Sequence, residues 1–140
     1  MPKVLNALDS PCTKVRAAAC QCTRSLSRSV KNLRTHLVDS GIAIPLLKLL
    51  SDPDLAVQTA ACATICNMVL DFSPMKRTVI ENGGIEALVT KVVYSTDTNL
   101  RLNALWALKN VLFQADSEVK MRVLVQLGFG VIKRFAFLAN

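Results

Sequence analysis

Two asparagines, Asn67 and Asn110, stand 43 positions apart, each among mostly apolar residues. A side-chain amide offers N–H donors and an acceptor that match the backbone groups of an extended peptide. Because polar groups among apolar neighbours need partners, we predict that both asparagines line a groove and hydrogen-bond a bound peptide. Alternatively, each amide satisfies backbone groups of its own or a neighbouring segment. Trp106 either lines the same groove or fills the core beneath it.

Basic residues gather near the start of the chain, where no acidic residue occurs between Asp9 and Asp39. Arg24 and Arg28 are four positions apart and would share one helix face. Arginine binds carboxylates through two parallel hydrogen bonds, so we predict an anchor for a carboxylate or an acidic tail. Lys109, equivalent to Arg24 in the repeat described below, joins this anchor. The alternative is a solvated helix face. The other basic residues of this run are Lys14, Arg16, Lys31 and Arg34.

The net charge of +7 favours an acidic partner. Nucleic acid is the rival interpretation of this charge. The basic residues are not interleaved with the aromatic side chains that stack on bases. We therefore expect no nucleic-acid partner.

No catalytic motif is present: GxSxG, GxxxxGK[ST], GxGxxG and HExxH do not occur. We therefore expect no enzymatic activity, no cofactor and no small-molecule substrate. Cys62 and Cys66 lie four positions apart and His36 is the single histidine, whereas a structural zinc requires four ligands at a recognisable spacing. We interpret the cysteines as reduced, mostly buried small residues and expect no metal site.

The chain repeats itself with a period of 42–43 residues. A shift of 43 places residues 41–70 on 84–113 without a gap, and a shift of 42 places Cys20 on Cys62. This period is typical of helical repeats, and each repeat reads as a short helix, a second helix and a longer third helix. One predicted buried face of a third helix follows helical spacing and comprises Val57, Ala60, Ala61, Thr64, Ile65 and Met68.

Serine followed by proline predicts N-caps with proline in the first helical turn at residues 10–11, 51–53 and 73–74. Gly41 and the pair Gly83–Gly84 predict left-handed C-caps at the ends of short helices. Acidic residues favourable to the helix dipole are expected at the helix starts Asp97, Asp116 and Glu118.

The third helices carry a resemblance to a known family. Residues 106–110, WALKN, resemble the WxxxN signature of armadillo repeats, best known in the importin-alpha family, where an asparagine ladder binds a peptide backbone. The match places this ladder on Asn67 and Asn110. Ala63 stands where the second tryptophan would be and Ser25 where the first asparagine would be, so an importin-like array of pockets is not expected. The predicted groove residues are Ser25, Asn67, Asn103, Trp106 and Asn110.

A second resemblance is more specific. Residues 10–39, SPCTKVRAAACQCTRSLSRSVKNLRTHLVD, strongly resemble the armadillo repeat-containing protein eight family, and residues 71–84 and 104–116 resemble it more loosely. That family supplies scaffold subunits of the CTLH (yeast GID) ubiquitin ligase, where the stack holds the substrate-receptor subunit against the catalytic core. The resemblance implies a non-catalytic scaffold whose partners are ubiquitin ligase subunits, including the substrate receptor.

We predict a single all-α domain over residues 1–140, a right-handed armadillo-type solenoid of about three repeats with three helices each. Repeats are expected at 31–72 and 73–115. Residues 1–30 form a partial repeat that lacks its first helix, and residues 116–140 one that lacks its third helix. Neither end reads as a polar cap, so we interpret the chain as part of a longer array and expect self-association through uncovered ends.

Three functional hypotheses follow: a ligase scaffold, a generic peptide adaptor of the importin-alpha or catenin type, and a purely structural array segment. An adaptor for basic peptides requires acidic groove residues, and none of the ladder-adjacent positions is acidic. The sequence lacks a signal peptide and an apolar stretch of about 20 residues. We therefore expect no membrane association and a location in the cytoplasm and nucleus.

Overall fold

The computed structural model describes residues 1–28, 31–70 and 74–138, and every regular element in that part of the chain is an α-helix, which confirms the all-α prediction. In chain order the helices are α1 (Pro2–Leu8), α2 (Thr13–Ser27), α3 (Lys31–Asp39), α4 (Ala43–Leu49), α5 (Leu55–Met68), α6 (Met75–Glu81), α7 (Gly84–Tyr94), α8 (Thr98–Leu112) and α9 (Ser117–Leu138).

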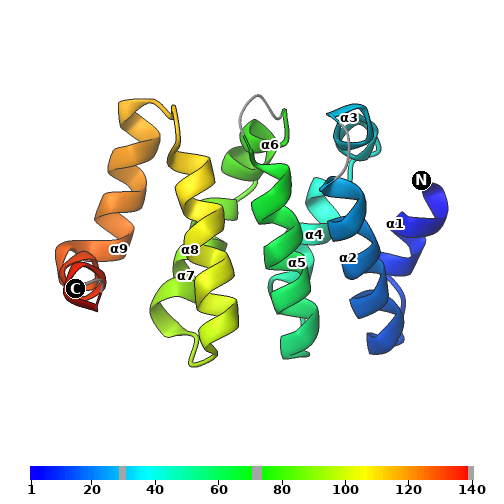
Figure 1. The fold of residues 1–140 in the computed structure, drawn as a ribbon, viewed down its shortest axis with the longest axis horizontal. Helices are drawn as coiled ribbons and strands as arrows, with labels where there is room; N and C mark the ends of the chain where they lie inside the picture. Colours follow the sequence, from blue (N-terminus) through cyan, green and yellow to red (C-terminus); the bar gives the residue numbers. More distant parts are fainter. Residues whose placement is uncertain (29–30, 71–73, 139–140) are drawn as a thin grey trace.

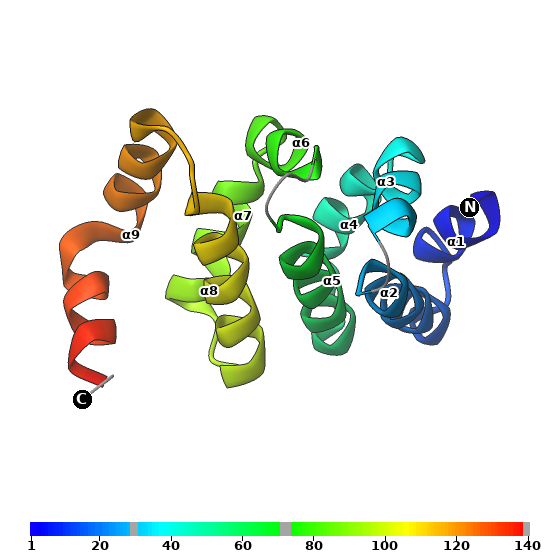
Figure 2. The ribbon, with the colours of Figure 1, turned by 45° about the horizontal axis from the view of Figure 1, so that its top comes forward.

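The helices form an elongated stack that progresses along the chain from α1 to α9 (Figure 1). The long helices α2, α5 and α8 run side by side as one layer, with α5 packed against both of the others. A second layer, α1, α4 and α7, lies behind them and packs against them. The short helices α3 and α6 and the start of α9 lie along one edge of the stack (Figure 2). Each repeat therefore contributes its third helix to one continuous face.

Aspartates cap two of the long helices, α5 and α8. The side chain of Asp54 accepts a hydrogen bond from Val57 N (3.0 Å), and Asp97 accepts one from Leu100 N (2.7 Å). The predicted serine N-caps are wrong at two sites, because α2 begins after Cys12 and α5 begins after Asp54, so the prolines lie in the preceding turns. The third predicted cap, Ser73, lies outside the described residues.

Left-handed glycines end the short helices, as predicted. Gly41 has φ +75° and Gly83 has φ +77°, a region that residues with a side chain rarely occupy. Gly128, with φ +70° and ψ 149°, breaks α9 into two segments. The chain thus bends sharply after each of these short helices, and each third helix returns to the same face of the stack.

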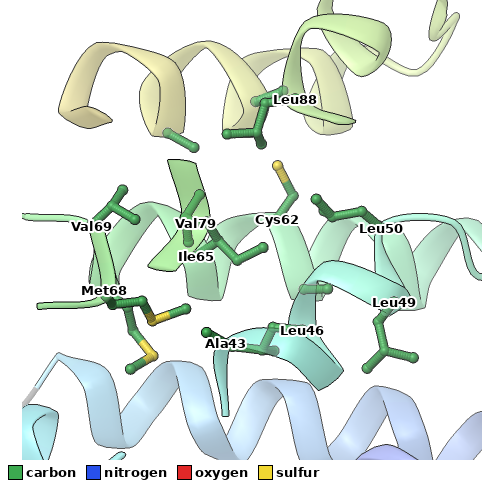
Figure 3. Close-up of a cluster of buried hydrophobic side chains, with 14 of the residues drawn as sticks. Ala43, Leu46, Leu49, Leu50, Cys62, Ile65, Met68, Val69, Val79 and Leu88 are labelled. Carbon is green, nitrogen blue, oxygen red and sulfur yellow. The ribbon is translucent and has the colours of Figure 1, made fainter. Parts of the chain in front are cut away.

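The core runs between the layers. All six residues of the predicted α5 face are buried, which confirms the helical pattern. Leu46 and Leu49 of α4, Ile65 and Met68 of α5, and Leu88 of α7 converge there (Figure 3). Helix α5 is buried from both sides because it is the middle helix of its layer, and it is therefore apolar around much of its circumference.

An ion pair ties α2 to the turn before α5. Arg16 donates from Nε to Asp52 Oδ2 (2.7 Å) and from Nη2 to Asp52 Oδ1 (3.1 Å). The Arg16 and Asp52 side chains are only 13% and 5% exposed. The Arg16 guanidinium lowers the pKa of the Asp52 carboxyl through this hydrogen bonding. Arg16 is therefore bound within the protein and does not contribute to the predicted basic anchor.

Candidate functional site

The face formed by α2, α5 and α8, hereafter the third-helix face, carries the predicted groove and anchor residues. Helix α2 supplies Arg24 and Ser25, α5 supplies Asn67, and α8 supplies Asn103, Trp106, Lys109 and Asn110. Arg28 is the C-cap residue of α2. Because α5 packs between α2 and α8, the three helices that carry these residues lie side by side (Figure 1).

None of the three helices contains an acidic residue. The sequences TKVRAAACQCTRSLS, LAVQTAACATICNM and TNLRLNALWALKNVL include basic residues only in α2 and α8. The carboxylates that directly precede α5 and α8, Asp54 and Asp97, are used as helix caps. The third-helix face therefore has a positive bias and suits a ligand that carries negative charge.

Asn110 links α8 to α5. Its Nδ2 atom donates to the backbone oxygen of Cys66 (3.0 Å) and lies 3.5 Å from Cys66 Sγ. The donor that the sequence assigned to a bound peptide thus satisfies backbone of the neighbouring repeat, which was the alternative interpretation.

Asn67 occupies the equivalent position on α5 but has a different environment. Its Nδ2 atom is buried, and no hydrogen-bond acceptor within residues 1–28, 31–70 and 74–138 reaches it. The 42-residue shift makes the backbone oxygen of Arg24 the counterpart of that of Cys66, and this oxygen accepts from Ser27 Oγ (2.7 Å). The Nε atom of Arg24 is also buried without an acceptor among the same residues.

The electrostatic surroundings of Cys66 indicate which cations lie around these two amides. Burial raises the pKa of its thiol, and Arg24, Lys109 and the hydrogen bond from Asn110 oppose that shift. Arg24 and Lys109, on the two helices that flank α5, therefore both lie within electrostatic range of one side chain. These two members of the predicted anchor thus lie on opposite sides of α5.

Trp106 lies on the surface and not in the core between repeats: 49% of it is exposed, and the Lys109 ammonium sits 4.7 Å from its ring centroid. Leu102 and Phe113, each 50% exposed, continue the same stripe of α8. Phe113 also lines a cavity of about 200 Å³ with Leu70, Lys109 and Asn110. Sequence analysis missed Leu70, Leu102 and Phe113, although their spacing from Trp106 and the 43-residue shift could have identified them.

The remaining predicted residues differ in hydrogen bonding and exposure. Asn103 donates to Asn99 O within its own helix (2.8 Å). Ser25 and Arg28 are exposed. The side chains of Lys31 and Arg34, predicted members of the basic run, lie outside the described residues.

The part of the chain that the structure describes contains neither a candidate metal-binding cluster nor a helix that could span a membrane. No three metal-ligating side chains gather there, and none of the helices combines the length and the apolar character that crossing a membrane requires. The cysteines there are free, and Cys20 and Cys62 are buried, but Cys66 is only partly buried and Cys12 and Cys22 are exposed, so the prediction of mostly buried cysteines is wrong.

Comparison with known proteins agrees with the helical architecture. The armadillo/beta-catenin-like repeat model matches residues 31–70 and 72–113, and the HEAT repeat model matches residues 1–30. A solved designed armadillo repeat protein, YIII(Dq.V1)4CPAF in complex with peptide (KR)4, superimposes with a TM-score of 0.77 and 21% identity, over 88% of this chain and 51% of that chain. The predicted armadillo solenoid is thereby confirmed.

Curated relatives are more similar in sequence. GID complex subunit 5 of Schizosaccharomyces pombe is 40% identical over 128 residues, which is 91% of this chain and 16% of that protein. Armadillo repeat-containing protein 8 of Danio rerio is 42% identical over 128 residues, 91% of this chain and 19% of that protein. These matches confirm the predicted resemblance, and the chain spans less than a fifth of the length of either relative. Because the armadillo matches cover more than half of its residues, the chain belongs to the armadillo/beta-catenin-like repeat family.

Proposed function

We propose that this chain is a non-catalytic scaffold segment of a CTLH/GID-type ubiquitin ligase, acting in the cytoplasm or nucleus, and that its third-helix face binds an extended segment of a partner subunit. The similarity to GID complex subunit 5 supports the assembly. The observation that carries the binding role is the exposed stripe of α8, where Leu102, Trp106 and Phe113 are each about half exposed.

The stripe has the chemistry of a binding hot spot. Tryptophan and arginine dominate the energetics of protein interfaces, where truncating one such residue costs about 2 kcal/mol or more. Trp106 is held by Lys109 on one side, which restricts the ring before a ligand arrives and lowers the entropy lost on binding. The cavity beside Phe113 can accept an apolar side chain of the partner.

The charge of the face opposes the adaptor alternative. The designed armadillo protein in the comparison is bound to the basic peptide (KR)4, whereas α2, α5 and α8 of this chain contain no carboxylate. A basic ligand would meet like charge at Arg24 and Lys109. We therefore favour a partner segment with acidic and apolar side chains.

The test compares variants of the whole chain as baits in cell extract, with ligase subunits quantified by mass spectrometry. Ligase subunits should be recovered by the unmodified chain and reduced at least about tenfold by the double variant Trp106→Ala, Phe113→Ala, which removes two hot-spot side chains. Phe129→Ala is the matched control, because Phe129 is an exposed aromatic residue on α9, away from the third-helix face.

Circular dichroism verifies that each variant remains folded. Recovery of the same subunits by the double variant would exclude the third-helix face as the binding site. Absence of ligase subunits from the unmodified bait would exclude the assembly itself.

A further inference from the structure

The seam between α2 and α5 holds two buried donors that cannot satisfy each other. Arg24 Nε and Asn67 Nδ2 both carry N–H groups, and neither has an acceptor within the described part of the chain. A buried donor left without an acceptor is destabilising, because it has lost its hydrogen bonds to water. This seam is therefore chemically matched to a group that brings acceptor oxygens.

In the neighbouring seam, between α5 and α8, the equivalent asparagine donates its hydrogen bond to an acceptor of the chain itself. Between α5 and α8, Asn110 Nδ2 bonds the backbone oxygen of Cys66. Between α2 and α5, the corresponding oxygen of Arg24 accepts from Ser27 instead. The two seams thus differ in how they use this amide: among the described residues, the asparagine of the α2–α5 seam has no internal acceptor, whereas that of the α5–α8 seam has one.

The repeat relates the two donors. The 42–43-residue shift makes Asn67 and Arg24 the counterparts of Asn110 and Cys66, which are hydrogen-bonded across the α5–α8 seam, and α2 packs against α5 as α5 packs against α8. Arg24 is also within electrostatic range of Cys66, the residue that precedes Asn67. Asp52, a carboxylate that contacts α2, is bound by Arg16 through two hydrogen bonds. Within residues 1–28, 31–70 and 74–138, no carboxylate accepts a hydrogen bond from Arg24 Nε.

We propose that Arg24 and Asn67 form a carboxylate-binding subsite that receives an aspartate or glutamate side chain of the extended segment bound to the third-helix face. A carboxylate supplies two acceptor oxygens, one for the guanidinium and one for the amide, and arginine presents its donors in the planar arrangement that a carboxylate matches. This inference rests on the proposed binding role of the face and adds the chemistry of its ligand.

The subsite also determines which part of the bound segment lies over which helices. Its acidic residue lies at the α2–α5 seam, and its apolar residues lie at α8, against Trp106 and Phe113. Arg24 and Asn67 are each only partly buried as residues, so a rotation of the Arg24 side chain can bring its Nε donor to the ligand.

The probes are acetylated, amidated and fluorescently labelled octapeptides, EEEELFLF and LFLFEEEE, each paired with an isostere in which glutamine replaces every glutamate. Anisotropy in about 0.15 M salt, where distant surface charges are screened, gives the affinities. At least one acidic probe should bind the unmodified chain about tenfold or more tightly than its isostere, as expected for a charge-assisted hydrogen-bonded pair.

Three variants separate the subsite from diffuse charge. Arg24→Gln should abolish the preference for glutamate over glutamine. Arg77→Gln, which removes the same charge from an exposed position on α6, should retain it. Asn67→Asp should abolish it as well, and should also raise the melting temperature, because the new carboxylate supplies Arg24 with an acceptor.

Each outcome has one meaning. If the glutamine isosteres bind as tightly as the acidic probes, or if Arg77→Gln loses as much preference as Arg24→Gln, the carboxylate subsite is wrong while peptide binding by the face stands. If no probe binds, both proposals fail for this face. If poly(U) RNA displaces the acidic probes with higher affinity, the cations serve a phosphate backbone and the subsite is equally wrong.

Discussion

At the scale of single residues, the ion pairs Arg16–Asp52 and Arg77–Glu81 differ in burial. The Arg16 and Asp52 side chains are 13% and 5% exposed, whereas those of Arg77 and Glu81 are 85% and 63% exposed. Arg16 also donates to the backbone oxygens of Ser10 and Pro11. Exposed helical pairs contribute little to stability, so of these two pairs Arg16–Asp52 is the one that helps to hold neighbouring repeats together.

Asp52→Asn should lower the melting temperature at pH 7 by several degrees, and this difference should vanish in acid. The pKa of Asp52 is held below its ordinary value of 3.8 by Arg16. A carboxyl whose pKa is lower in the folded than in the unfolded chain stabilises the folded chain at pH values above the unfolded-state pKa. This stabilisation is lost as the pH falls through the folded-state pKa. Thermal unfolding of both proteins between about pH 7 and pH 2 checks this.

Glu81→Gln is the matched control and should leave the melting temperature nearly unchanged across this pH range, because its pair is exposed. A destabilisation by Asp52→Asn that persists undiminished at the acid end would show that the ion pair is not its cause.

At the scale of elements, the connection between α6 and α7 depends on a close approach that the equivalent connection between α3 and α4 does not have. Gly41 and Gly83 both adopt positive φ, but Gly84 has a different role. A Cβ atom at Gly84 would lie 2.6 Å from the backbone oxygen of Val79 and would overlap Val79 Cγ1. The start of α7 therefore packs directly on α6, which sets the position of the following helix, α8.

Gly84→Ala should destabilise the protein by roughly 1–3 kcal/mol, as overpacking against backbone does. Gly130→Ala is the control, because a Cβ atom there meets nothing within 4 Å and alanine favours the helix. Urea unfolding followed by circular dichroism measures both. Equal midpoints for Gly84→Ala and the unmodified protein would contradict the close approach.

At the scale of the whole molecule, stability should vary along the stack. Repeat arrays are stabilised by each unit and its contacts with immediate neighbours. Helix α5 packs against α2, α4 and α8, whereas α9 has its main contacts with α7 alone and α1 with α2 and α4. Helices at the ends of the stack are therefore expected to open before the centre.

Amide hydrogen exchange measured by mass spectrometry should show the slowest exchange in α5 and the fastest in α1 and α9, because opening at an end breaks only one interface. A uniform protection across all helices would instead indicate that the stack unfolds as one cooperative unit. The measurement is made without denaturant and repeated below the unfolding midpoint, where the difference between the centre and the ends should grow.

The sequence by itself determined the helices, the repeat and the buried face of α5. These features depend on local spacing: apolar residues at helical intervals, glycine where φ must be positive, and aspartate at helix starts. The 42–43-residue period also placed Asn67, Asn110, Arg24 and Lys109 on one face. Each of these features arises within one repeat or from the recurrence of the repeat along the chain, so the sequence alone could predict it.

Only the tertiary structure decided how each polar side chain is used. Asn67 and Asn110 have the same phase, yet one amide is bound by the neighbouring repeat and the other is not. Arg16 was indistinguishable from Arg24 in the basic run until folding placed Asp52 beside it, 36 positions away. A hydrogen bond depends on distance and direction between helices, which periodicity does not encode. The candidate site was therefore located by the sequence, but its free donors were identified by the packing of α2 against α5.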